Sequence, residues 1–199
     1  KKTDRTQPAI FIHSSITFYL INVKDIYAFA GHSLGEFSAV TCSGSLSFEE
    51  GLELVLIRAR AMQSACKNDD STMAAILALS DEKVNEICQT IDDVVPANYN
   101  CPGQIVISGT NEGIKLACEK LLEKGAKRAL PLPVGGAFHS PLMKPARETL
   151  TKALDLIKIK DPKYPFFNNV DGKLQIRGEN IKASLIEQLE KPVLWTKSI

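Results

Sequence analysis

The sequence predicts an α/β fold built from two parts, and three observations support this prediction. A short apolar run at residues 26–30 leads through a glycine-flanked turn at residues 31–35 into a stretch that can form a helix. Residues 71–132 follow the order strand, helix, strand, strand, helix, strand, which is the ferredoxin-like order. The chain has 199 residues, 44% hydrophobic and 24% charged, which suits a globular protein of one or two domains.

Apolar spacing and capping signals predict the first elements. A core-facing helix is expected over residues 8–20. Its buried side is expected to carry Ala9, Ile10, Ile12, Ile16 and Leu20. The helix after the glycine-flanked turn ends at Gly44. Ser47 with Glu50 three positions later is a capping box, which predicts a second helix running to about Ala65.

Turn residues predict the remaining elements. Strands are expected at residues 73–79, 94–99, 104–108 and 127–132, and helices at 81–90, 111–124 and 141–157. Turn chemistry at residues 100–103 joins the two middle strands, and Gly125 suits the left-handed end of a helix. We therefore assign residues 1–68 and 135–199 to one subdomain and residues 69–134 to an inserted one.

Ser33 is the candidate nucleophile. It lies in Gly31-His32-Ser33-Leu34-Gly35, between an expected strand and an expected helix, which is the layout of a nucleophile elbow. Such a tight turn needs close backbone approach, so we expect neither glycine position to tolerate a side chain. The helix N-terminus after the serine favours negative charge developing on a substrate oxygen, which suits acyl transfer.

Arg58 and His139 are the other candidates. Arg58 projects from a largely apolar helix face, which indicates a buried ion pair, a snorkelling side chain or a fork that binds a carboxylate. His139 follows a glycine-rich turn and precedes a helix, where loops carry function. It is a better candidate base than His32, because the side chains of adjacent residues such as His32 and Ser33 rarely point toward the same place. His32 is expected to support the elbow.

Several classes of site are not indicated. The net charge of +1 and the lack of a basic block argue against nucleic acid as a partner, and no apolar run is long enough to span a membrane. No metal-binding cluster or cofactor motif is found. The cysteines are odd in number and lack a Cys-x-x-Cys pair, so we expect small buried hydrophobes in a reducing compartment. They are Cys42, Cys66, Cys88, Cys101 and Cys118.

Four motifs carry a resemblance to a known family. They are residues 31–36, Arg58 with Met62-Gln63, the stretch from Asn98 to Gln104, and residues 136–143. Together they resemble the malonyl-CoA:acyl carrier protein transacylases, which are related to the acyltransferase domains of polyketide synthases. The resemblance covers nearly the whole chain.

The resemblance implies a hydrolase-like large subdomain with a parallel sheet, a ferredoxin-like insert, and a cleft between them. It makes Ser33 the nucleophile, His139 its base and Arg58 the clamp on the malonyl carboxylate. The Leu34 backbone N–H becomes an oxyanion donor and Asn98 a pocket residue. In related acyltransferases the residues before the catalytic histidine vary with the acyl group that is accepted. A phenylalanine directly before the histidine is similar to the enzymes that select malonyl, so Phe138 would occupy the space that an α-methyl group needs.

The implied reaction is ping-pong transfer of malonyl from malonyl-CoA to the phosphopantetheine thiol of holo acyl carrier protein, supplying type II fatty-acid elongation without a cofactor. We expect a monomer in the cytoplasm, with a plastid or mitochondrial interior as the alternative. Relatives begin with a strand and a glycine-glutamine-glycine loop that adds a second oxyanion donor. They also continue past Ile199 with a carbonyl that orients the histidine. We therefore expect truncation at both ends.

Two other functions remain open. A thioesterase would use the same elbow but needs an acidic residue between serine and histidine, for which Asp92, Asp93 and Glu112 are available. A non-catalytic carrier-binding module would use a cationic face. That face would consist of Lys120, Lys124, Lys127 and Arg128.

Overall fold

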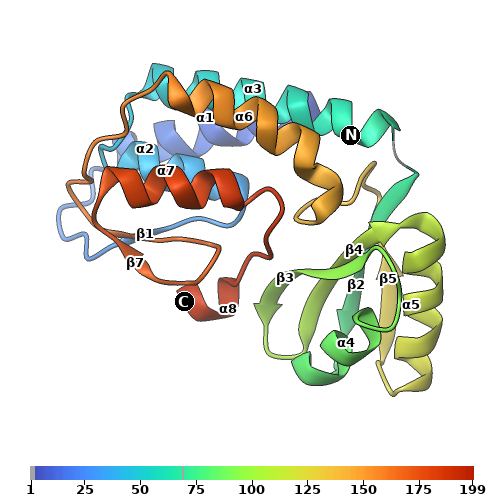
Figure 1. Cartoon of the computed structure of the whole chain (residues 1–199). Coiled ribbons are helices and arrows are strands. Elements are labelled where there is room, and N and C mark those ends of the chain that lie inside the picture. Colours follow the sequence, from blue (N-terminus) through green and yellow to red (C-terminus); the bar gives the residue numbers. More distant parts are fainter. Residues whose placement is uncertain (1–2, 69) are drawn as a thin grey trace.

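The structure is a computed structural model that describes residues 3–68 and 70–199. Asp69, where the predicted insert begins, lies outside the described residues, as do Lys1 and Lys2. The elements form two groups (Figure 1), here called the large part, residues 3–68 and 135–199, and the small part, residues 70–134. No helix in these ranges is long and apolar enough to cross a bilayer.

The large part is a layer of helices over a short three-stranded sheet (Figure 1). Its elements are α1 (Thr3–Ile21), β1 (Phe29–Ala30), α2 (Leu34–Cys42), α3 (Phe48–Asn68), the 3-10 helix η1 (Pro141–Met143), α6 (Lys144–Asp155), β6 (Phe166–Phe167), β7 (Leu174–Gln175), α7 (Gly178–Glu187) and α8 (Trp195–Ser198). The predicted capping box forms: the Ser47 N–H donates to Glu50 at 2.8 Å and the Glu50 N–H to the Ser47 hydroxyl at 3.1 Å.

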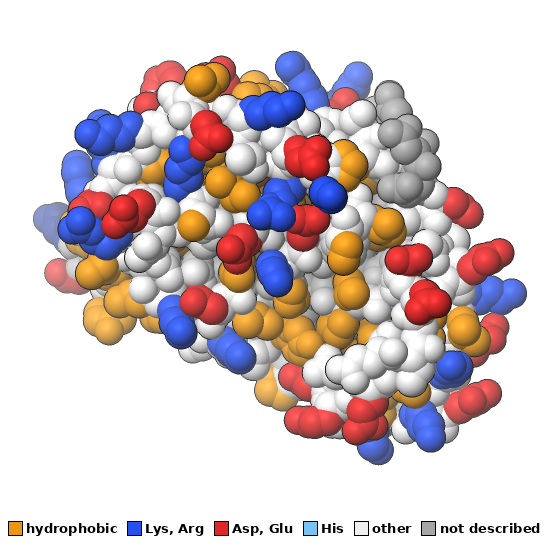
Figure 2. All heavy atoms as spheres, in the orientation of Figure 1, with side chains coloured by type: hydrophobic (Ala, Val, Ile, Leu, Met, Phe, Trp, Pro, Cys, Tyr) orange, Lys and Arg blue, Asp and Glu red, His pale blue; other side chains and the backbone are white. Residues whose placement is uncertain are grey.

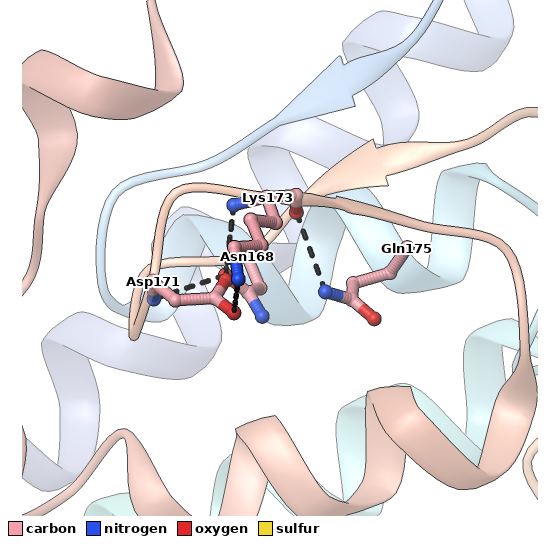
Figure 3. A network of polar contacts seen from close by, with 4 residues as sticks. All are labelled: Asn168, Asp171, Lys173 and Gln175. Atoms are coloured by element: carbon pink, nitrogen blue, oxygen red, sulfur yellow. Dashed lines mark hydrogen bonds and ion pairs between the residues drawn. The ribbon is translucent and has the colours of Figure 1, made fainter.

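The sheet of the large part is mixed, so the expectation of a parallel sheet is only partly right. β1 and β6 are parallel, whereas β6 and β7 are antiparallel. A tight turn over residues 168–173 causes this, because a short connection can join only antiparallel neighbours. In the turn, Asn168 Oδ1 accepts from the backbone N–H groups of Asp171 and Lys173 at 3.2 and 3.4 Å (Figure 3).

Helix α1 covers the predicted residues 8–20 but begins earlier, at Thr3, and it presents a different face to the core. Ile10, Ile16 and Leu20, predicted to be buried, are 49%, 48% and 78% exposed. The buried residues are Gln7, Phe11 and Ser15, which are spaced four apart on one face. The apolar pattern was misleading because the buried face carries polar residues, and Gln7 has a polar partner in the core.

The small part is a four-stranded antiparallel sheet with two helices. Its elements are β2 (Ser71–Leu77), α4 (Asp81–Cys88), β3 (Val94–Cys101), β4 (Gln104–Thr110), α5 (Asn111–Glu123) and β5 (Arg128–Pro131). The sheet order is β3-β4-β2-β5. Gly103 and Gly125 take φ values of +76° and +101°, at the predicted hairpin turn and helix end. The helices of the small part pack on one face of the sheet, with Ile76, Ile107 and Leu121 in the core between them.

The other face of the small sheet turns toward the large part. Met73, Ala97 and Val106 form a second apolar cluster there, against which Phe138 packs. Val193 also pairs with the edge strand β3, since its N–H donates to Ala97 O at 2.8 Å and its carbonyl accepts from the Tyr99 N–H at 2.9 Å. Figure 2 shows hydrophobic side chains gathered where the two parts meet.

All five cysteines are free, as predicted. Cys88 is buried, but Cys101 is exposed at the end of β3, so the prediction of a buried hydrophobe is wrong for that residue. A hairpin end such as this one lies at the surface, because a turn leaves its backbone polar groups to water.

Candidate functional site

Ser33 lies on a strained turn between β1 and α2. Its φ of 52° and ψ of −105° are rarely adopted by a residue with a side chain, and such strain is typical of functional turns. Gly31 makes the turn possible, because a Cβ there would lie 2.0 Å from Gly35 O. At Gly35 a Cβ would meet nothing within 4 Å. The steric expectation is therefore correct for Gly31 and wrong for Gly35.

The Ser33 hydroxyl is hydrogen-bonded to His139. The distance from Ser33 Oγ to His139 Nε2 is 2.8 Å, although the two residues are 106 positions apart. The other ring nitrogen, Nδ1, lies 2.8 Å from the backbone carbonyl of Gln188. Because a carbonyl can only accept, Nδ1 carries the proton and Nε2 is free to accept the serine proton.

His139 is neutral at physiological pH. Its side chain is buried, and burial together with the nearby Arg58 charge lowers its pKa from 6.5 to about 3. The hydrogen bond to Gln188 partly opposes this shift. A neutral imidazole whose unprotonated nitrogen faces a hydroxyl is the state required of a general base.

Arg58 is fully buried beside the serine. It is 1% exposed, and its Nη2 donates to Ser33 Oγ and to Gln188 Oε1, both at 3.0 Å. Nη1 donates to Gln7 Oε1 at 2.5 Å, and the guanidinium lies 5.5 Å from the Phe37 ring centroid. Burial lowers the pKa of Arg58 to about 10, so the side chain stays charged at neutral pH.

The surroundings of Arg58 bear on the expected interpretations of this residue. Among the described residues no carboxylate oxygen lies within 4.0 Å of the guanidinium, and its Nε has no hydrogen-bond partner. A buried ion pair is therefore absent within residues 3–68 and 70–199. The guanidinium is a desolvated cation whose hydrogen-bond partners Gln7, Ser33 and Gln188 are all neutral, although the nearby buried Glu36 raises its pKa. Such a cation favours an anion at the site.

A cavity of about 470 Å³ opens onto these groups. All seven residues predicted to form the site line it: His32, Ser33, Leu34, Arg58, Asn98, Phe138 and His139. His32 Nε2 lies 2.9 Å from the Asn100 Oδ1 of β3, and its ring is 5.5 Å from that of Trp195. His32 thus contacts the small part from the elbow.

Sequence reasoning missed four polar residues around the serine: Gln7, Glu36, Asn169 and Gln188. Asn169 accepts from the Ser33 N–H at 2.7 Å and donates to Gly31 O at 2.8 Å. Gln7 shares a helix face with Phe11, but a lone glutamine near the start of a helix is typical of an exposed position, so its burial was not predictable from the sequence. Asn169 and Gln188 lie in segments with no recognisable motif.

The histidine is oriented by a different residue from the one expected. The carbonyl that holds His139 was expected beyond Ile199, but Gln188 supplies it within the chain. The residue follows directly after α7, where the last carbonyl groups of a helix have no intrahelical partner. A helix end was therefore a plausible source of this acceptor.

The chain belongs to a known class of protein. The family described as acyl transferase domain matches residues 2–198, and the chain is a member of that family. Among its curated relatives, the malonyl CoA-acyl carrier protein transacylase of Escherichia coli O157:H7 is 40% identical over 205 residues, covering 100% of this chain and 66% of that protein. The enzyme of the same name from Bacillus subtilis strain 168 is 46% identical over 174 residues, covering 85% of this chain and 55% of that protein.

Solved structures of such transacylases have a similar fold. A malonyl-transacylase in complex with its type II PKS acyl-carrier protein superposes with a TM-score of 0.93 at 37% identity, covering 99% of this chain and 66% of that chain. The present chain thus spans just under two thirds of the length of such relatives.

Proposed function

We propose that the protein transfers a malonyl group from malonyl-CoA to the phosphopantetheine thiol of holo acyl carrier protein, and that it supplies type II fatty-acid elongation. The names of the relatives, and the carrier protein bound to one of them, support this substrate and this partner. The proposal needs no cofactor. Its roles are Ser33 as nucleophile, His139 as general base and Arg58 as the group that binds the malonyl carboxylate.

The observation that carries the proposal is the position of Arg58. A guanidinium that is 1% exposed, has no carboxylate oxygen within 4.0 Å among the described residues, and lies 3.0 Å from the candidate nucleophile favours an anion near the reacting carbon. A malonyl thioester has its carboxylate one methylene away from the carbonyl that Ser33 would attack. An acetyl group would leave the charge unpaired, which costs a few kcal/mol in a buried site.

The first half-reaction follows from the hydrogen bonds. Ser33 Oγ attacks the thioester carbonyl carbon as its proton passes to His139 Nε2. The oxyanion of the tetrahedral intermediate is stabilised by the Leu34 N–H, which belongs to the first residue of α2 and has no intrahelical acceptor. When the intermediate collapses, the C–S bond breaks, and CoA leaves with the proton from His139. Malonyl remains esterified to Ser33.

The second half-reaction reverses these roles. The carrier thiol gives its proton to His139 Nε2 and attacks the ester carbonyl, and Ser33 leaves and regains the proton. Asn98 borders the acyl chain from the small part, and His32 borders it from the elbow of the large part. Phe138 narrows the cavity where an α-methyl group would extend.

The architecture we propose is a hydrolase-like large subdomain interrupted by a ferredoxin-like insert, with the substrate bound between them. The cluster formed by the small sheet and Phe138 supports this, since it brings the sheet face to the cavity. We further propose that the protein acts as a monomer in the cytoplasm, or in a plastid or mitochondrial interior.

The thioesterase alternative lacks support from the geometry. Its candidate acids, Asp92, Asp93 and Glu112, are exposed on the small part, and His139 Nδ1 is held by a backbone carbonyl instead. The carrier-binding alternative relies on a basic face of the small part, where Lys124, Lys127 and Arg128 are exposed and Lys120 is half-buried. Figure 2 shows charges of both signs over the visible side of the small part.

The test is to measure the mass of the undigested protein by mass spectrometry after it is mixed with malonyl-CoA, before and after holo carrier protein is added. We expect the mass of one malonyl group on Ser33, its absence in Ser33→Ala, and its loss to the carrier. Release of free malonate without a carrier would indicate a thioesterase. Absence of any acylation would overturn the proposal.

A further inference from the structure

Glu36 is a buried acid that the proposed mechanism does not use. It lies in the first turn of α2, three residues after the candidate nucleophile, and it is 0% exposed. No cation of the described residues lies within 4.0 Å of its carboxylate. A buried carboxyl group is costly, and an apolar residue would fill the same space without that cost. Its hydrogen bonds must therefore provide what packing alone cannot.

The first hydrogen bond of Glu36 connects it, through Asn169, to the backbone of Ser33. Its Oε1 accepts from the Asn169 N–H at 3.3 Å. The Asn169 side chain bridges the strained turn, because it accepts from the Ser33 N–H and donates to Gly31 O. The backbone of Asn169 follows Asn168, whose side chain closes the turn between β6 and β7 (Figure 3).

The second hydrogen bond of Glu36 connects it, through Gln188, to Arg58 and His139. Glu36 Oε2 accepts a short hydrogen bond from Gln188 Nε2, which also donates to Ser33 O at 3.0 Å. The other end of the same amide, Oε1, accepts from Arg58 Nη2. The backbone carbonyl of Gln188 holds His139. One carboxylate is thus connected through two amides to the nucleophile, the base and the guanidinium.

The chemistry of these groups fixes the direction of the Gln188 amide. A carboxylate and the Ser33 carbonyl only accept hydrogen bonds, and a guanidinium only donates them. The amide between them must therefore turn its NH2 toward Glu36 and its carbonyl toward Arg58. Resting on the proposed function, we propose that Glu36 is a positioning residue: by orienting the Gln188 amide, it sets the guanidinium of Arg58 for a carboxylate-bearing acyl group.

Glu36→Gln tests this inference with almost no change in shape. A glutamine there has one accepting and one donating end, yet both of its neighbours, the Asn169 N–H and the Gln188 NH2, are donors. If it accepts from Asn169, its NH2 faces Gln188, and the Gln188 amide turns over. The NH2 of Gln188 then faces Arg58, donor against donor, and displaces the guanidinium.

The readout is the rate of Ser33 acylation by malonyl-CoA divided by that by acetyl-CoA, measured by intact mass in single turnover. We expect Glu36→Gln to lower this ratio by about tenfold or more, because a charge-assisted hydrogen bond is misdirected. Gln188→Leu should lower it similarly, and the double variant should lose little more. Glu53→Gln, at an exposed position of α3, is the matched control and should leave the ratio unchanged.

The outcomes separate this inference from the proposed function. If the wild-type protein is acylated by neither substrate, the proposed function fails. If it is acylated and Glu36→Gln slows both substrates equally, or neither, Glu36 is structural and the inference is wrong.

A measurement on the wild-type protein keeps the inference testable if the variants do not fold. Burial raises the pKa of Glu36 to about 7 against the opposing effects of Gln188, the Asn169 backbone and Arg58, with Asp171 adding to the rise. Protonation makes the carboxyl a donor, so the malonyl to acetyl ratio should fall as the pH drops through about 7. Arg58 and His139, with pKa values of about 10 and 3, do not titrate there. A constant ratio would contradict the inference.

Discussion

Replacing Arg58 by alanine should reduce acylation by malonyl-CoA far more than acylation by acetyl-CoA. Hydrogen bonds to a charged group are worth about 1.5–3 kcal/mol each. A carboxylate that receives two of them from the guanidinium would gain about 3–6 kcal/mol, which is a factor of about 10² to 10⁴ in rate. An acetyl group has no carboxylate, so its rate of transfer to Ser33 should fall only as far as the altered surroundings of Ser33 slow the reaction.

The assay compares single-turnover acylation of Ser33 by the two thioesters in the intact protein. Arg60→Ala is the matched control, because Arg60 lies on the same helix, α3, but on its exposed side. Denaturant unfolding of both variants reports how much stability each change removes. If malonyl and acetyl acylation fall by the same factor in Arg58→Ala, the side chain serves the fold and the anion-binding argument is refuted.

Three further predictions concern the turn, the buried acid and the acyl pocket. Gly31→Ala should cost at least about 3 kcal/mol of unfolding free energy and abolish acylation, whereas Gly35→Ala, without a steric conflict, should be neutral or stabilising by up to about 1 kcal/mol in denaturant unfolding. Glu36 has its pKa raised from 4.5 to about 7, so the folded state binds its proton more tightly. The free energy of unfolding should therefore fall by about 3 kcal/mol as the pH rises from 4.5 to about 7, relative to that of Glu36→Gln. The comparison with the variant cancels the opposite contribution of His139, whose lowered pKa makes stability fall on acidification below about 6.5. Phe138→Ala should raise methylmalonyl over malonyl acylation by about 10- to 200-fold in a competition assay, and an unchanged ratio would remove Phe138 from the pocket's selectivity.

The residues that were predictable from sequence share a local signature. Ser33 is flanked by a strand, a helix and the glycine that its turn requires, and Arg58 interrupts an apolar helix face. The strands and helices of the small part were predictable for the same reason, because residues such as Gly103 and Gly125 mark their ends. Each of these signals is contained within one element and its neighbouring turn.

The residues that were missed act across the fold. Gln188 serves the site through its backbone carbonyl, which every residue has, and its position opposite His139 depends on how α7 packs. Asn169 reaches Ser33 from a turn that lies 136 positions away. The buried face of α1 was misassigned because Gln7 looks like a surface residue until its partner Arg58 is known. Spacing along one segment contains no information about such pairs.

The arrangement of charges links acyl selection to the basicity of the histidine. The positive charge of Arg58 is one of the causes that lower the pKa of His139, after burial. A malonyl carboxylate bound to Arg58, as proposed, would neutralise that charge and so raise the pKa of His139. The base would then be strongest in the acyl-enzyme, where it must take the proton of the carrier thiol. An acetyl group on the same serine would leave Arg58 uncompensated and His139 a weak base, so the side chain proposed to select the acyl group would also favour its onward transfer.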